Sequence, residues 1–197
     1  YFFNEAWPLK RHVKNLLGED WIDEGHEFYP SVAEKEMLTP LLHAENKVQK
    51  LFYCGINWEY LLDKKSRNEG LLHALGKKGL VDIFGPNKLN NIKVWKDFKC
   101  YMGEVDFDGE ALKHRIKQYA AVLAISSPAH FKSETSSSRV FEGFSAGVPV
   151  ISDENPHVKK LFGDSVYYFR GKDAQEKSAN IEKILSEIKL NPEVALR

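Results

Sequence analysis

Residues 120–151 read AAVLAISSPAHFKSETSSSRVFEGFSAGVPVI, and the order of elements within them decides the fold class. Residues 120–125 are a continuous apolar run with the length of a buried strand. A polar loop follows, then a predicted helix over residues 138–146 that ends at Gly147. Residues 148–151 form a second apolar run, in which proline is tolerated because it stands near the strand start. Strand, helix and strand in this order are typical of a parallel sheet covered by helices.

The same alternation continues on both sides of this stretch. Apolar runs predict strands at residues 51–55, 80–84, 99–102, 120–125, 148–151 and 166–169. Helical patterns separate or follow them, at residues 67–78, 109–119, 138–146, 158–162 and 174–189. The sequence therefore predicts an α/β fold, a Rossmann-like doubly wound parallel sheet of about six strands.

The first quarter of the chain does not share this rhythm, because prolines, glycines and tryptophans interrupt it. Short helices are predicted at residues 10–17 and 32–37. Because the chain starts in mid-pattern rather than with Met, we interpret residues 1–49 as a connector or the remnant of a missing N-terminal domain. Residues 50–172 are the predicted sheet domain, and residues 173–197 are a predicted C-terminal amphipathic helix.

Composition narrows the class of partner and the compartment. The 28 basic and 28 acidic residues cancel, so no overall charge favours nucleic acid or an anionic membrane. No segment approaches the ~20 apolar residues of a membrane-spanning helix, and no signal peptide is visible. Cys54 and Cys100 lie in predicted strands and form no CxxC pair, so neither a zinc site nor a redox motif is indicated. We expect a cytoplasmic protein, either free or peripheral at a membrane.

Open α/β sheets bind ligands at the carboxyl ends of their strands, which directs attention to two loops. The first follows Gly55 and carries Asn57 and Trp58, then the basic residues Lys64, Lys65 and Arg67 just before a predicted helix. Positive charge beside a helix N-terminus suits a diphosphate, although solvated charges at a helix start give the same pattern. Trp58 fits either stacking on a base or sugar, or a place in the core.

The second loop carries Glu134, Ser136, Ser137 and Ser138 and leads into the helix that contains Glu142. Serine hydroxyls and free N–H groups at a helix start suit phosphate oxygens, and carboxylates suit sugar hydroxyls. An exposed Glu134 and a plain serine N-cap are the alternatives. A capping box that would occupy Glu142 needs Ser or Thr three positions earlier, and that position is Arg139. His130 and His157 lie near these loops and fit either a ligand contact or a structural role.

The spacing Glu134-x7-Glu142, followed by Gly-Phe-Ser-Ala-Gly-Val-Pro-Val-Ile-Ser, resembles the signature of retaining GT-B glycosyltransferases of the family 4 type and the related spore-protein-like branch. Upstream, the run from Tyr101 to Val105, Tyr-Met-Gly-Glu-Val, is similar to the aromatic-x-Gly-x-Val turn of these enzymes. The resemblance covers residues 50–170. The chain departs from it in two places: it lacks the Gly-Phe-Gly after the first Glu and the Arg-x-x-x-Lys-Gly form of the basic loop.

The resemblance implies the C-terminal, nucleotide-sugar-binding domain of a GT-B enzyme that acts in polysaccharide biosynthesis. Glu134 would be catalytic and contact the donor sugar, while Glu142 would hold the ribose hydroxyls. The diphosphate would face the three serines, with charge from the basic residues. The implied donor-binding set comprises Glu142, Ser136, Ser137, Ser138, Arg139, Lys64, Lys65, Arg67, Gly55, Asn57 and Gly103.

The implied reaction transfers a hexose from a UDP- or GDP-sugar to a glycan, a lipid-linked sugar or another hydroxyl, with retention. No cofactor and no metal are expected, because Asp106-Phe107-Asp108 has the form of a metal motif but reads as a surface turn. The general base of such enzymes comes from the N-terminal domain, so this chain could bind donor without transferring it. A sugar-nucleotide epimerase of the same fold and a non-catalytic binding module are the alternatives. A dinucleotide oxidoreductase is disfavoured because no GxGxxG follows the first strand.

Overall fold

The computed structural model describes residues 2–3, 26–27, 48–61, 68–106, 108, 110–133 and 135–191. The helices predicted at residues 10–17 and 32–37 lie outside these ranges. The described residues of the first quarter of the chain form two short strands, β1 (Phe2–Phe3) and β2 (His26–Glu27), which pair in parallel.

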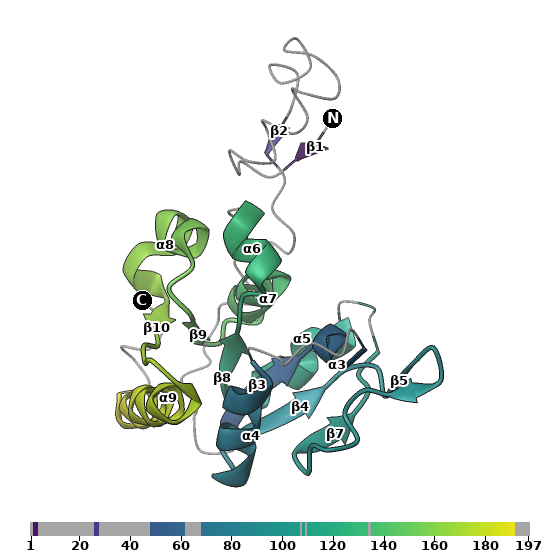
Figure 1. Cartoon of the computed structure of the whole chain (residues 1–197). Helices are drawn as coiled ribbons and strands as arrows, with labels where there is room; N and C mark the ends of the chain where they lie inside the picture. Colours follow the sequence, from purple (N-terminus) through teal and green to yellow (C-terminus); the bar gives the residue numbers. More distant parts are fainter. Residues whose placement is uncertain are drawn as a thin grey trace.

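The predicted parallel sheet of six strands is confirmed (Figure 1). Its spatial order is β10-β9-β8-β3-β4-β7, and every neighbouring pair is parallel. The strands are β3 (Val48–Cys54), β4 (Val81–Phe84), β7 (Tyr101–Gly103), β8 (Tyr119–Ala124), β9 (Val150–Ser152) and β10 (Tyr167–Tyr168). The chain starts at the centre, runs to the β7 edge, returns beside β3 and then runs to the β10 edge. This is the doubly wound order of a Rossmann fold, with its switch point between β3 and β8.

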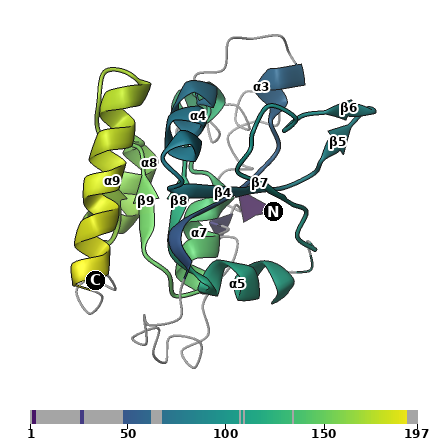
Figure 2. The same ribbon diagram turned by 90° about the horizontal axis from the view of Figure 1, so that it is seen from below.

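Helices cover both faces of the sheet (Figure 2). Helices α4 (Glu69–Lys77) and α9 (Ala174–Leu190) pack on one face, in a core that includes Leu51 and Tyr53 of β3. On the other face α5 (Glu110–Lys117) packs in a second core with Phe52. Consecutive residues of β3 thus enter opposite cores, as the period of two in a strand requires. Helices α7 (Ser138–Ser145) and α8 (Pro156–Phe162) complete the cover, followed by a 3-10 turn at Gly163–Ser165.

Several short elements were not predicted. They are α3 (Trp58–Leu61), α6 (Pro128–Ser133) and a hairpin of β5 (Lys88–Leu89) with β6 (Ile92–Lys93). Each is too short to show a hydrophobic period. Two asparagines with positive φ, Asn90 (48°) and Asn91 (64°), make the hairpin turn, a conformation that asparagine tolerates better than most residues.

The two cysteines are free and half-buried, but only one lies in a strand. Cys54 ends β3, whereas Cys100 precedes the start of β7 at Tyr101, so the strand predicted at residues 99–102 begins later than expected. Within the described ranges, no helix combines the length and the apolar character needed to cross a membrane.

Candidate functional site

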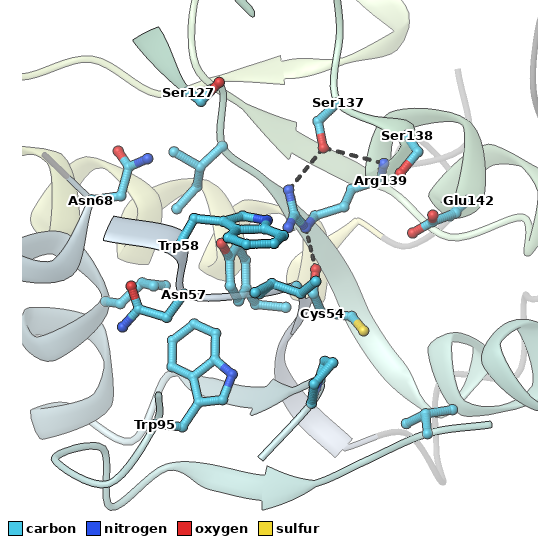
Figure 3. Close-up of a pocket in the computed structure, with 18 of the residues that line it drawn as sticks. Cys54, Asn57, Trp58, Asn68, Trp95, Ser127, Ser137, Ser138, Arg139 and Glu142 are labelled. Atoms are coloured by element: carbon cyan, nitrogen blue, oxygen red, sulfur yellow. Dashed lines mark hydrogen bonds between the residues drawn. The ribbon is translucent and has the colours of Figure 1, made fainter. Parts of the chain in front are cut away.

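A pocket of about 800 Å³ lies where the carboxyl ends of four neighbouring strands of the sheet meet the start of α7 (Figure 3). Its walls come from the segments that follow β3, β4, β7 and β8, from the start of α4, and from Ser138, Arg139 and Glu142 of α7. The adjacent strands β3 and β8 lead the chain to opposite sides of the sheet, which opens a crevice between the departing loops. The pocket therefore occupies the position where this class of sheet binds its ligands.

Two glycines allow the pocket floor to form. Gly85 has φ of +135°, and a Cβ there would lie 2.0 Å from the carbonyl oxygen of Gly55. A Cβ on Gly55 would in turn lie 2.0 Å from Nη2 of Arg139. Gly55 and Gly85 both line the pocket, whereas the predicted site residue Gly103 does not; its carbonyl accepts the Gly85 N–H at 3.1 Å.

Arg139 is held over this floor by contacts with three residues. Its Nε donates to the carbonyl oxygen of Cys54, and its Nη1 donates to Oγ of Ser137 at 2.8 Å. The guanidinium carbon lies 4.7 Å from the ring centroid of Tyr53. No carboxylate among the described residues forms an ion pair with Arg139, although it lines the pocket. A preformed cation of this kind is suited to bind an anion.

The three serines have different environments. Ser137 is the N-cap of α7 and accepts the backbone N–H of Arg139 at 3.4 Å, so the N-cap alternative applies to it even though it also lines the pocket. Ser138 is exposed on the first turn of α7 and lines the pocket. Ser136 does not line it, and its hydroxyl is buried without a hydrogen-bond partner among the described residues.

Glu142 lies in the second turn of α7, half-buried, and lines the pocket (Figure 3). The helix begins after Ser137, so Glu142 is not at the position that a capping-box carboxylate takes.

Burial raises the pKa of the Cys54 thiol to about 11, with Arg139 opposing the shift and Glu142 adding to it. Cys54 is therefore a thiol rather than a nucleophilic thiolate at neutral pH.

His130 lies on α6 and lines the pocket. Its Nδ1 accepts the backbone N–H of Ser127 at 3.2 Å, so the ring proton of the neutral form is on Nε2. Burial first, and then the charge of Arg139, lower the pKa of His130, while Asp153 opposes the shift. His130 is thus a neutral hydrogen-bond donor at neutral pH. His157, by contrast, is buried near the start of α8 and does not line the pocket.

The aromatic wall contains two residues that the sequence did not indicate as site residues, Tyr53 and Trp95. Trp95 is 2% exposed, lines the pocket and packs edge-on against Tyr53, with ring centroids 6.2 Å apart. Asn57 holds this segment, because its Nδ2 donates to the carbonyl oxygen of Val94 at 3.1 Å. Trp58 is 55% exposed at the pocket wall, which excludes a core position for it. Trp95 lies in the irregular connection between β4 and β7, where no periodic pattern singles it out.

The pocket thus brings together six of the predicted site residues: Gly55, Asn57, Ser137, Ser138, Arg139 and Glu142. Glu134, Lys64, Lys65 and Arg67 lie outside the described residues, and their roles stay predictions. Asp108 is exposed and accepts the N–H of Ala111 at 2.8 Å at the start of α5, while Asp106 is exposed at the pocket rim. In the described part of the chain, no three His, Cys, Asp or Glu side chains gather as metal ligands would.

Comparison with known proteins agrees with this architecture. A family model described as glycosyl transferase-like matches residues 65–196, which is more than half of the chain and includes α7 and most of the sheet. A search of curated proteins finds no match. The chain belongs to the glycosyl transferase-like family.

Proposed function

We propose that this chain binds a nucleoside-diphosphate sugar in the pocket and transfers the sugar to a hydroxyl group with retention of configuration. The observation that carries the proposal is the meeting of Arg139, the start of α7 and Glu142 at the switch point of the sheet. The donor is a UDP- or GDP-sugar, and the acceptor is a glycan or a lipid-linked sugar.

Arg139 and the first turn of α7 are suited to the diphosphate. The guanidinium is already oriented by Cys54 and Ser137, so little side-chain freedom is lost when an anion binds. The N-terminal turn of α7 adds the positive end of the helix dipole. Together they would stabilise the negative charge that develops on the diphosphate as the glycosidic bond breaks.

Glu142 is suited to hydroxyl groups rather than to the phosphates. An ionised carboxylate accepts hydrogen bonds from vicinal hydroxyls such as those of a ribose. Its place one turn beyond Arg139 on the same helix would set the ribose beside the diphosphate. Glu134, by the Glu-x7-Glu resemblance, would contact the sugar at the reacting carbon, and an acceptor hydroxyl would be activated by a group from another domain.

Isothermal titration calorimetry with UDP and with GDP, both in EDTA, tests the proposal. We expect saturable binding of one nucleotide, weakened about tenfold or more in Glu142→Gln, since a charged acceptor is lost. Glu187→Gln is the matched control: Glu187 lies on the exposed side of α9, paired with Lys183 at 3.9 Å, and its loss should not alter affinity. Absence of binding of either nucleotide to the wild-type chain would overturn the proposal. Analysis of the products formed from a nucleotide sugar and an acceptor separates transfer from epimerisation.

A further inference from the structure

Asn155 is the centre of a buried hydrogen-bond network beside the pocket. Its side chain is 0% exposed. As the N-cap of α8, its Oδ1 accepts the backbone N–H groups of His157 at 2.9 Å and Val158 at 3.3 Å. This half of the amide performs ordinary helix capping, which an aspartate or a serine would perform equally well.

The other half of the same amide reaches two further segments. Its Nδ2 donates to the carbonyl oxygen of Thr135 at 2.9 Å and to Oγ of Ser126 at 3.0 Å. Ser126 in turn donates its hydroxyl to Asp153 at 2.8 Å and its backbone N–H to the same carboxylate at 2.7 Å. Asn155 therefore uses both N–H bonds and both acceptor sites of its amide, which is the full capacity of the group.

These bonds tie the pocket to the sheet. Ser126 follows β8, and Thr135 stands between α6 and α7, two residues before the N-cap Ser137. The backbone N–H of Thr135 donates to the carbonyl oxygen of His130 at 3.0 Å, so Thr135 is held on both sides. The position of Arg139 depends on where α7 begins, and the Thr135 carbonyl is a fixed point just before that start.

We infer that Asn155 is a positioning residue that holds the start of α7, and with it Ser137 and Arg139, at the pocket. The inference rests on the proposed function for the ligand it serves, a nucleoside diphosphate. Capping alone does not require an amide. A carboxylate cannot donate to Thr135, and a serine hydroxyl is too short to reach both Thr135 and α8. A fully satisfied buried network of this kind restricts the segments that it joins.

The variant Asn155→Ser separates the two halves, because serine keeps the cap of α8 and loses the two amide N–H bonds to Thr135 and Ser126. Asp173→Ala is the matched control: Asp173 caps α9 by accepting the N–H groups of Gln175 and Glu176, both at 2.9 Å, and is absent from the pocket wall. Amide hydrogen exchange over residues 135–140 is the readout that does not need a ligand. We expect exchange there about tenfold faster in Asn155→Ser and unchanged in Asp173→Ala.

Wild-type exchange in Asn155→Ser would overturn the inference, and so would the same acceleration in Asp173→Ala, since that would reflect global destabilisation. Calorimetry with UDP and GDP is the second arm. We expect affinity about tenfold weaker in Asn155→Ser and unchanged in Asp173→Ala. Undiminished affinity in Asn155→Ser would likewise contradict the role. If the wild-type chain binds neither nucleotide, the proposed function fails, and hydrogen exchange alone decides the role of Asn155.

Discussion

The guanidinium of Arg139 occupies the space that the missing side chain of Gly55 leaves. A Cβ on Gly55 would lie 2.0 Å from Nη2 and 3.0 Å from Cζ of Arg139. The two residues are joined further through the chain neighbour of Gly55, because the carbonyl of Cys54 accepts a hydrogen bond from Nε of Arg139. Because Gly55 has no side chain, the guanidinium of Arg139 on α7 can pack directly against the backbone that follows β3.

The substitution Gly55→Ala should displace Arg139 and weaken nucleotide binding. The clash is with the far end of a flexible side chain, so we expect a stability loss of only about 1 kcal/mol but an affinity about tenfold lower. Gly70→Ala is the control, because Gly70 is exposed on α4 and a Cβ there meets only Ala174 Cβ at an ordinary 3.5 Å. Calorimetry and urea unfolding measure both quantities. Equal nucleotide affinities for the two variants would contradict the role of Gly55 in positioning Arg139.

The substitution Arg139→Lys should also weaken nucleotide binding, although it keeps the charge. Lysine cannot contact Cys54, Ser137 and an anion at once, because it lacks the planar fork of the guanidinium. We expect a loss of about tenfold in UDP or GDP affinity. Arg170→Lys is the control for replacing an arginine by a lysine, because the Arg170 side chain is 73% exposed and pairs with Glu154. An Arg139→Lys chain with wild-type affinity would show that charge alone suffices.

The substitution Gly85→Ala should destabilise the fold severely. Its φ of +135° is unfavourable for alanine, and the added Cβ would meet the Gly55 carbonyl oxygen, a backbone atom, at 2.0 Å. We expect a loss above ~2 kcal/mol. Gly79→Ala has φ of +67° but no atom within 4 Å, so it should cost only about 1 kcal/mol. Urea unfolding midpoints compare the stabilities of the two variants. A smaller loss of stability in Gly85→Ala than in Gly79→Ala would contradict the close approach of Gly85 to Gly55.

The buried hydroxyl of Tyr119 should make the folded state less stable at alkaline pH. Burial, and then the negative charge and hydrogen bond of Asp82, raise the pKa of Tyr119 above its ordinary value of 10.0. A raised folded-state pKa contributes stability that is complete below the unfolded pKa and is lost as pH rises toward the folded pKa. Tyr119→Phe should therefore lose about 1 kcal/mol at pH 7 but lose less additional stability than wild type above pH ~10.

Tyr168→Phe is the control at neutral pH. The pKa of Tyr168 is raised to about 12, mainly by burial, but its hydroxyl has no hydrogen-bond partner among the described residues. Its removal should leave stability at pH 7 unchanged or slightly higher, because a buried unpaired hydroxyl is lost. Thermal unfolding from pH 7 to 11 measures the stability of both variants. If the stability of wild type and of Tyr119→Phe fell in parallel with pH, Tyr119 would not be the group whose ionisation destabilises the fold.

The fold class can be predicted from hydrophobic patterns within single segments, because the buried face of each helix or strand determines where its apolar residues stand. Strand β8 is buried along its whole length and reads as a continuous apolar run, and the buried part of β3, residues 51–53, does the same. Strand β4 is also buried, and its apolar run is interrupted by Asp82 alone. The stripe Ile181, Ile184, Leu185 and Ile188 on α9 faces the core, as its helical spacing predicts. Elements that hold hardly more than one period, such as α3 with four residues and the β5–β6 hairpin with two in each strand, show no repeat and are not predicted from the sequence.

The sequence by itself determined the doubly wound sheet and two features of the site, Glu142 on a helix and serines before it. Only the tertiary structure decided that Arg139 rests on Gly55, that Trp95 forms part of the wall and that Asn155 holds Thr135. Arg139 and Cys54 are 85 residues apart, and Asn57 and Val94 are 37 apart. Such contacts depend on strand order and on the packing of every element between the partners, which no local period records.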